Sequence, residues 1–283
     1  MNKLKIIIIL SILNIPIYYG QSTESTRSLL DKMHQSILKY QDLKFTLYRS
    51  ERDGTEYVKG SFDGKLTMNP FRVYLKNHFP NEGSEILYLQ GKNNNKAWIN
   101  PNAFPYLTVS LDPENKLLLA GGHHTLKLLG FSVIDKLILL YRKNYKEEFF
   151  NFTKYHGMEN WKNMKCHKII LNYPDYKIIT HVAKKEETLK SIAEKKLLNI
   201  AKLKKLNPSV NPNKVLYPGQ KVKITNAYAK KAILYLDAES YLPVLQIIYD
   251  EKGIYEKYGY FNLEFGKKIP DEEFTTDFKE YNF

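Results

Sequence analysis

The chain has a single cysteine, Cys166, among its 283 residues. One cysteine cannot form an intramolecular disulfide, and the lack of paired cysteines excludes the common structural zinc modules. Cys166 lies between Lys165 and His167 in an alternating strand pattern, where burial is the usual outcome for a free thiol. The protein must therefore derive its stability from a hydrophobic core.

The sequence also lacks the short motifs of common catalytic sites: it contains no HExxH, no GxSxG elbow and no glycine-rich phosphate loop. The best catalytic-looking group is Asp112 followed by His123 and His124, after a double glycine. Adjacent histidines usually point in different directions, so a metal site would need a third ligand from elsewhere. The histidines available for that role are His78, His156 and His167. We predict no enzyme activity, no catalytic residue, no metal and no cofactor, with a hydrolase as the open alternative.

Long apolar runs are missing after the N-terminus. Lys3 and Lys5 precede an apolar run from 6 to 17, and small residues follow around Gly20, which is the pattern of a signal peptide. The run is too short to span a bilayer, and no later segment offers eighteen apolar residues. We predict a signal peptide over 1–20 and an exported protein of the periplasm or cell envelope that is soluble after cleavage.

Positive charge is concentrated in one segment. The formal net charge is +13, and residues 177–225 contribute about nine of these charges through twelve lysines and three glutamates. A basic face suits a polyanion, and a solvated lysine-rich surface is the alternative interpretation. Nucleic acid is not expected as a partner, because the segment contains no arginine and export removes the protein from the genome.

The same segment has the pattern of a two-strand, two-helix unit. A β-branched strand over 177–183 precedes Thr188, a good N-cap, and an apolar stripe at helical spacing. Asn199 can cap a second helix that ends before Pro208, and a Pro-Gly turn leads into a strand over 221–224. So small a unit without cysteine has a marginal core, which attachment of both ends to a larger fold would offset.

These residues resemble a LysM domain. The likeness rests on HVAKKEETLKSIAEKK, LKKLNP and VLYPGQKVKI and covers the unit from end to end. The resemblance implies binding of N-acetylglucosamine-containing glycans of peptidoglycan or chitin, in a shallow groove between two loops. By position, the glycan-binding residues are Glu187, Thr188 and Leu189 in the first loop, and Asn207, Pro208 and Ser209 in the second. Glu186 stands where the family usually has glycine, and Ala183 where it has a larger apolar residue.

The flanking regions are rich in strand patterns. A helix is predicted over 26–40, and alternating runs separated by turn residues predict strands over 43–51, 57–68, 71–77, 84–90 and 96–99. A helical pattern follows within 113–143. Strands are then predicted over 147–155, 164–171, 231–237, 244–249 and 254–262. This order predicts one meandering antiparallel sheet.

A second resemblance is carried by GKLTMNPFRVYLK, NNNKAWINPNAFPYLTVSLDP, GGHHTLKLLGF, KCHKIILNYP and LDAESYLPVLQIIYDEKG. These segments look like an uncharacterised family of secreted bacterial proteins, similar in turn to LolA/LolB-like lipoprotein-carrier proteins. The resemblance implies an α+β fold: a curved antiparallel sheet, an unclosed half-barrel, with helices on its concave side and a cavity for acyl chains. The 22 tyrosines and 14 phenylalanines suit such a lining or an ordinary aromatic core.

The predicted domains are therefore a signal peptide (1–20), a discontinuous carrier-like domain (21–176 and 226–283) and a LysM domain (177–225). The ends of the LysM unit should lie close together in a hairpin loop of the sheet. The function expected is peptidoglycan binding together with binding or carriage of a lipid or lipoprotein, and membrane association should be peripheral at most. A peptidoglycan- or lipid-acting hydrolase and a purely structural envelope scaffold are the alternatives.

Overall fold

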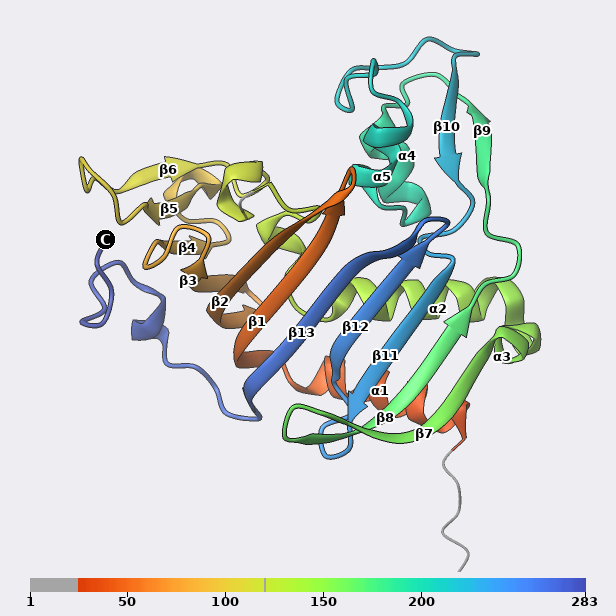
Figure 1. The fold of residues 1–283 in the computed structure, drawn as a ribbon. Coiled ribbons are helices and arrows are strands. Elements are labelled where there is room, and N and C mark those ends of the chain that lie inside the picture. Colours follow the sequence, from red (N-terminus) through yellow and green to blue (C-terminus); the bar gives the residue numbers. More distant parts are fainter. Residues whose placement is uncertain (1–24, 120) are drawn as a thin grey trace, which may run out of the picture.

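The computed structural model describes residues 25–119 and 121–283, so the predicted signal peptide lies outside the described residues. Its body is one eleven-stranded antiparallel sheet in the order β6-β5-β4-β3-β2-β1-β13-β12-β11-β8-β7 (Figure 1). The strands β6 and β7 form two free edges, so the sheet does not close into a barrel. This confirms the predicted fold class.

The sheet strands have the following bounds: β1 Asp42–Asp53, β2 Glu56–Met68, β3 Phe71–Phe79, β4 Glu85–Leu89, β5 Ala97–Asn100, β6 Val109–Leu111, β7 Thr153–Trp161, β8 Met164–Asn172, β11 Lys231–Asp237, β12 Pro243–Asp250 and β13 Gly253–Phe265. Helix α1 is Thr26–Lys39 and helix α2 is Ser132–Tyr145. Both helices lie across one face of the half formed by β1, β13, β12, β11 and β8 (Figure 1). Among the residues described, no helix has the length and apolar character needed to cross a membrane.

The core lies between these helices and the sheet. Its largest fully buried side chains include Leu29, Leu30 and Met33 of α1 and Leu66 of β2. The aromatic residues fill space within it: Phe131 and Phe45 both pack against the ring of Tyr260. Aromatic rings of this size bury large apolar areas, which favours the interpretation of an aromatic core.

Two sequence predictions were wrong in detail. The helix expected from residue 113 begins only at Ser132, after the 3-10 turns η2 (Lys116–Leu119) and η3 (Leu126–Leu128). Gly121 and Gly130 have φ of 74° and 87°, a left-handed conformation that interrupts helix. The strand expected from residue 147 begins at Thr153, because a 3-10 turn η4 (Lys146–Glu148) and a short helix α3 (Phe149–Phe152) precede it.

The LysM-like unit forms a separate two-stranded sheet of β9 (Ile178–Val182) and β10 (Lys221–Thr225), with α4 (Leu189–Lys196) and α5 (Ile200–Leu206) between them. It has its own core, which includes Leu189, Ile192, Leu203 and Val222. The unit occupies the connection between the neighbouring strands β8 and β11. The predicted boundaries at 177 and 225 stay a prediction.

The two ends of this unit are held side by side, as predicted from the sequence. The Asn226 side chain accepts a hydrogen bond from the Lys177 amide at 2.8 Å and donates one to the Asp175 carbonyl at 2.7 Å. The Tyr173 amide then donates to the Lys230 carbonyl at 2.8 Å, which continues the β8–β11 pairing. The unit is therefore an insertion into one hairpin loop.

Candidate functional site

The first LysM helix begins with a capping box. The Thr188 hydroxyl accepts from the Ser191 amide, and the Ser191 hydroxyl accepts from the Thr188 amide, both at 2.9 Å. These two bonds satisfy backbone donors that the first helical turn leaves free. They also fix the loop after β9 to the start of α4.

Backbone contacts join this loop to the segment before β10. The Leu216 amide donates to the Glu187 carbonyl at 2.8 Å, the Lys190 amide donates to the Pro212 carbonyl at 2.9 Å, and Thr188 and Val215 form an isolated bridge. The first predicted glycan-binding loop therefore lies directly beside residues 212–216.

The six predicted glycan-binding residues differ in their surroundings. Leu189 is fully buried in the unit's core, and buried Asn207 bonds both the Lys223 amide and the Lys223 carbonyl, which ties α5 to β10. The Glu187 carboxylate accepts bonds from the Lys184 amide at 2.9 Å and from His181 at 2.7 Å. Pro208 and Ser209 are exposed. The side chains of Leu189, Asn207 and Glu187 thus shape the loops, whereas Pro208 and Ser209 are free to meet a ligand.

The six residues predicted from the LysM resemblance do not include two exposed apolar side chains that lie next to these loops. Val215 is 56% exposed and Tyr217 is 74% exposed, although both flank the buried Leu216. An exposed aromatic ring beside irregular loops suits the apolar face of a sugar. The signal that could have found Tyr217 is its place immediately before the Pro218-Gly219 turn.

The two departures from the LysM pattern have clear structural settings. Glu186 has φ of 65°, a left-handed conformation that glycine adopts without strain and that explains the family's preference there. Its side chain is exposed. Ala183 is buried and its backbone pairs with Gln220 and Gly219, so the small residue still closes the core.

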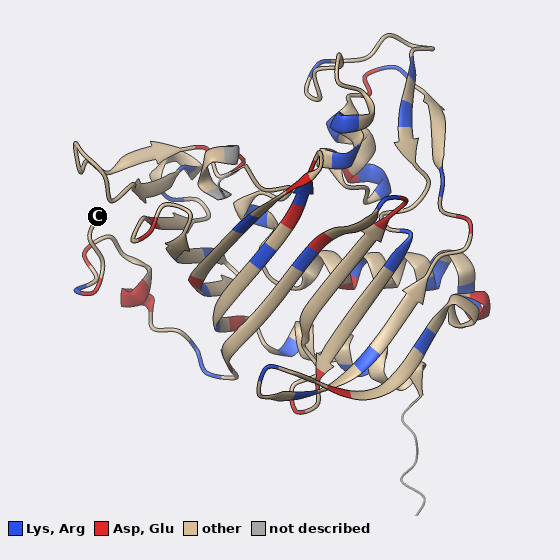
Figure 2. Ribbon diagram, viewed as in Figure 1, with Lys and Arg blue, Asp and Glu red and all other residues tan. Residues whose placement is uncertain are grey.

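The second LysM helix docks on the large sheet through buried polar contacts. Lys202 is buried, and its ammonium lies 2.7 Å from Asp250 and 2.6 Å from Glu251, at the β12–β13 turn. Lys205 lies 3.0 Å from Asp53 at the β1–β2 turn. Part of the unit's positive charge is therefore used inside the molecule, while other lysines of the unit remain exposed. Figure 2 shows basic residues along α4, α5 and β10.

A buried carboxylate pair lies beneath this docked helix. Glu51 of β1 and Glu256 of β13 are direct cross-strand partners, and both are almost completely buried. Two like charges opposite each other are destabilising unless cations or donors surround them. Here Arg49 donates to Glu51 at 2.5 Å, and the Tyr258 hydroxyl donates to its other oxygen.

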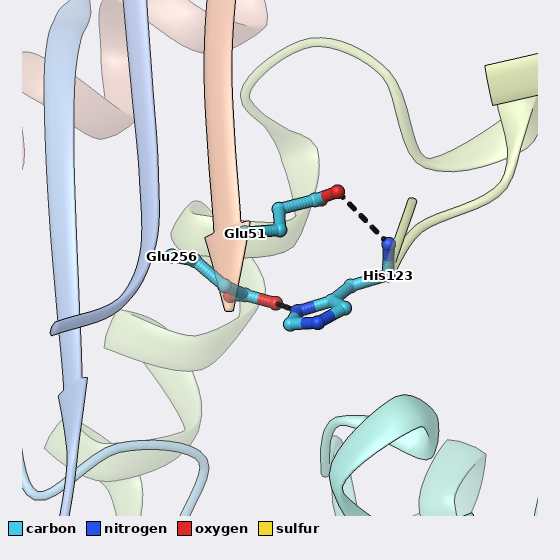
Figure 3. A group of neighbouring side chains, drawn as sticks. All are labelled: Glu51, His123 and Glu256. Carbon is cyan, nitrogen blue, oxygen red and sulfur yellow. Dashed lines mark hydrogen bonds and ion pairs between the residues drawn. The ribbon is translucent and has the colours of Figure 1, made fainter. Parts of the chain in front are cut away.

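Glu256 gathers donors from three parts of the chain. His123 Nδ1 lies 2.7 Å from Glu256 Oε1 (Figure 3). The Tyr228 hydroxyl donates to Oε2 at 2.9 Å. Asn199, the N-cap of α5, also donates to Oε1. His124 Nε2 lies 3.4 Å from the same oxygen. The adjacent histidines thus converge on one carboxylate, contrary to the expectation that they point apart.

The charges in this network shift the pKa values of Glu256 and His124 in the direction opposite to that caused by burial. Burial alone would raise the pKa of Glu256, but the charge and hydrogen bonds of His124 and His123 outweigh it and hold that pKa well below the ordinary range. Burial alone would lower the pKa of His124, but Glu256 and then Glu51 raise it. Burial and then Glu256 hold the pKa of Tyr228 well above its ordinary value. The ionic form of the network is favoured.

Glu51, His123 and Glu256 bring ligand atoms within 4.8 Å of one another, a spacing that suits a metal ion. However, each carboxylate oxygen of the pair already accepts a hydrogen bond from a protein group. His123 Nε2 also lies 3.2 Å from the Arg52 carbonyl, so both ring nitrogens already have protein partners. The group is complete as a hydrogen-bonded ion-pair network, and sequence reasoning missed it because its acids come from distant strands.

The other chemistry-bearing residues lie apart from this network. Cys166 is buried, as expected, and burial raises the pKa of its thiol to about 11. Asp112 caps a turn by accepting from the Glu114 amide. His78 contacts Asp63, and His167 stacks on Tyr241. Neither histidine supplies a third ligand.

Two apolar spaces open on the large domain. On the concave side, α2 and the network border a cavity of about 60 Å³. A larger groove of about 330 Å³ lies beside β2–β6 and is lined by Phe62, Ile86, Ile99, Val109, Leu111 and Leu118, among others. Only the larger groove approaches the size of small-ligand pockets.

An open antiparallel half-sheet with a LysM insertion thus defines the class of protein, and a LysM domain is a binding module rather than an enzyme. The model of the LysM domain matches residues 181–225. The chain belongs to the family described as protein of unknown function DUF1571, whose model matches residues 40–189. A search of curated proteins finds no match.

Solved structures give weak overall likeness. A LolA superfamily protein from Nitrosomonas europaea has 10% identity, with 90% of this chain and 100% of that chain covered, at a TM-score of 0.34. The MucA/MucB complex of Pseudomonas aeruginosa has 10% identity, 88% and 60% coverage and a TM-score of 0.42. The lipoprotein LppX of Mycobacterium tuberculosis has 10% identity, 86% and 98% coverage and a TM-score of 0.39. Likeness at these TM-scores carries no functional argument.

Proposed function

We propose that this is a non-enzymatic protein of the cell envelope that binds N-acetylglucosamine-containing glycan of peptidoglycan through its LysM unit. The observation that carries the proposal is the LysM match over residues 181–225, with Pro208 and Ser209 exposed in the second loop. Tyr217 adds an exposed ring near the same surface. Absence of catalysis is part of the proposal, and it is supported by the hydrogen-bonded state of the Glu51–Glu256 pair.

The second half of the proposal is that the curved-sheet domain binds a lipid or a lipoprotein. The groove beside β2–β6 supports it, because its volume of about 330 Å³ is lined mostly by apolar side chains. The predicted export would bring the protein to both ligands.

The glycan half is tested by sedimentation of the protein with purified peptidoglycan. Ser209→Tyr places a bulky ring at an exposed position of the second loop, and we expect it to reduce the retained fraction about tenfold. The matched control is Lys196→Tyr, at the exposed end of α4 far from its N-cap, which should leave retention unchanged.

Competition separates glycan recognition from charge. Soluble oligomers of N-acetylglucosamine should release the protein at moderate salt. If salt releases it and the oligomers do not, binding is due to the exposed lysines and the glycan proposal is wrong. The lipid half is read separately, by mass spectrometry of lipid that co-purifies with the protein, and absence of lipid contradicts that half alone.

A further inference from the structure

A cleft of about 350 Å³ lies where the LysM unit meets the large sheet. Its walls come from both parts: Leu206 belongs to α5, Gly54 to the β1–β2 turn and Lys252 to the β12–β13 turn. Figure 1 shows α5 beside the tip of the β1–β2 hairpin. Because residues of the unit and of the sheet line it together, the docking of α5 forms this cleft.

The cleft adjoins the second of the two predicted glycan-binding loops. Leu206, which lines the cleft, is the last residue of α5, and Asn207, Pro208 and Ser209 follow it directly. Three residues span at most about 11 Å even when the chain is fully extended. Exposed Ser209 therefore lies within that distance of the cleft wall, and a glycan held by this loop passes close to the cleft.

The lining of the cleft is polar and nearly balanced in charge. Four cationic side chains and three acidic side chains contribute to it: Arg52, Lys202, Lys205, Lys252, Asp53, Asp250 and Glu251. Lys202 contacts both Asp250 and Glu251, Arg52 contacts Asp250, and Lys205 contacts Asp53. Such a lining offers little apolar surface to an acyl chain and little excess charge to a polyanion. Its neighbouring donors and acceptors suit a neutral ligand that is rich in hydroxyl groups.

The cleft has an exposed rim and a buried floor. The rim residues are exposed, and they include Asp53, Lys205, Glu251 and Lys252. The floor residues are buried: Lys202, Asp250 and Tyr255. A ligand can therefore contact charged groups at the rim without any change in the fold.

Tyr255 on the floor has an unsatisfied polar group. The residue is 3% exposed, and its hydroxyl has no hydrogen-bond partner within the described ranges 25–119 and 121–283. The ring is held in place by His123, whose ring centroid is 4.5 Å away, and by Arg52 and Lys202, each 5.5 Å from its centre. A buried hydroxyl without a partner is unfavourable. A polar ligand group in the cleft would satisfy it.

We propose that the cleft is a second sugar subsite, which continues the LysM glycan groove onto the large sheet. The inference rests on the glycan half of the proposed function and adds residues of the host domain to that binding site. Sugar hydroxyls contact Asp53 and Lys252 at the rim, and one polar group of the sugar bonds the Tyr255 hydroxyl. An N-acetylglucosamine unit is the occupant, because it is neutral, it carries donors and acceptors, and its polymer meets the adjoining loop.

The subsite is tested by calorimetric titration of the full mature chain with N-acetylglucosamine oligomers of three and six sugars. The double variant Asp53→Ala with Lys252→Ala removes two rim groups of opposite charge, so the net charge is unchanged. It should lower the affinity for the hexamer about tenfold and hardly affect the trimer, which the loops alone can hold. The matched control is Glu56→Ala with Lys59→Ala, an exposed pair on β2 outside the cleft, which should bind both oligomers like the unaltered chain.

A second variant, Tyr255→Phe, removes the floor hydroxyl alone. The affinity for the hexamer should fall about threefold, because one hydrogen bond to the ligand is lost. The melting temperature should not fall, since this hydroxyl has no partner in the described part of the chain. The control is Tyr235→Phe, which removes a hydroxyl on β11 that bonds Glu159 and should leave binding of both oligomers unchanged.

The variant Ser209→Tyr separates this inference from the glycan proposal, because it should weaken binding of both oligomers. If neither oligomer binds the unaltered chain, the glycan proposal is wrong and the inference fails with it. If both bind and the rim double variant keeps full affinity for the hexamer, only the inference is wrong. If the rim variant weakens binding of peptide-bearing peptidoglycan fragments alone, the cleft holds the stem peptide, which also overturns the sugar assignment.

Discussion

The two halves of the sheet are completed in different ways. The half from β1 through β13 to β7 is covered by α1 and α2, and the LysM helix α5 is clamped to the ends of its strands (Figure 1). The half from β2 to β6 carries the open groove and the exposed β5–β6 loop. The covered half contains the buried Glu51–Glu256 network, and the open half contains the most exposed apolar side chains of the large sheet domain. Stability and lipid binding are therefore expected to respond to different substitutions.

The contacts that hold the LysM unit also differ between the two halves, because one is buried and the other is exposed to solvent. Lys202 reaches the covered half through a buried ammonium, whereas Lys190 reaches Glu114, near the open half, through a side chain that is 39% exposed. Solvent screens the second contact far more than the first. The covered half therefore fixes the orientation of the unit.

The largest expected effect comes from breaking the buried network of the covered half. Glu256→Ala should lower the free energy of unfolding by about 3–5 kcal/mol, because it removes the acceptor shared by His123, Asn199 and Tyr228. Urea denaturation measures the change. The control is Glu159→Ala, on an exposed carboxylate of the same half paired with Lys168, and a similar loss in both variants would contradict a special role of the buried network.

Truncation of an apolar side chain should affect stability much more in the covered half than in the open half. Leu30→Ala removes a fully buried side chain of α1 and should cost about 2–5 kcal/mol of unfolding free energy. Leu117→Ala, at an exposed position of the open half, should stay within about 0.5 kcal/mol. Thermal or urea unfolding of the two variants checks this, and a costly Leu117→Ala would mean that the open half is packed.

The network should also make stability depend on pH. The raised pKa of His124 gives a contribution that is complete below its ordinary value of 6.5 and is lost as pH rises through the folded value. The lowered pKa of Glu256 gives one that is complete above its ordinary value of 4.5 and is lost as pH falls. Both contributions are therefore complete between 4.5 and 6.5.

The measurement compares the melting temperatures of the unaltered chain and Glu256→Gln inside this window and about three pH units above it. The difference between the two proteins should shrink at the higher pH. Tyr228 and Tyr258 stay neutral there, because their pKa values are held well above the ordinary range. A difference that does not change with pH would exclude the ionic description of the network.

The smallest effect concerns the LysM loop. Glu186→Gly should raise the free energy of unfolding by about 0.5–1 kcal/mol, since relief of the left-handed strain exceeds the entropy that glycine adds to the unfolded chain. Glu194→Gly, inside α4, is the matched control and should destabilise. Calorimetry measures whether each variant is more or less stable than the unaltered chain.

Local signals in the sequence predicted most of the sheet and the LysM unit. Alternating patterns and turn residues located nearly every strand, and the caps Thr188 and Asn199 located α4 and α5 correctly. The short strand β6 was missed, because three residues are too few for an alternation to be visible. The helix expected from residue 113 failed because apolar spacing continues through Gly121 and Gly130, whose backbone conformation excludes helix.

The Glu51–Glu256 network could not be predicted from the sequence, for a different reason. Its two acids are cross-strand partners more than two hundred positions apart, and that pairing is set by the order of strands in the whole sheet. Nothing local marks either residue as buried. The paired histidines were visible, but the carboxylate that joins them was not.

The docking of α5 has a practical consequence for domain deletions. Because Asn226 brings the two ends of the insertion together, a short linker could replace residues 177–225 without straining the β8–β11 hairpin. Such a truncated chain would nevertheless leave Asp250, Glu251 and Glu256 without contacts that Lys202 and Asn199 now provide. The folding stability of the excised chain should therefore be measured before its loss of peptidoglycan retention is attributed to the missing glycan-binding loops.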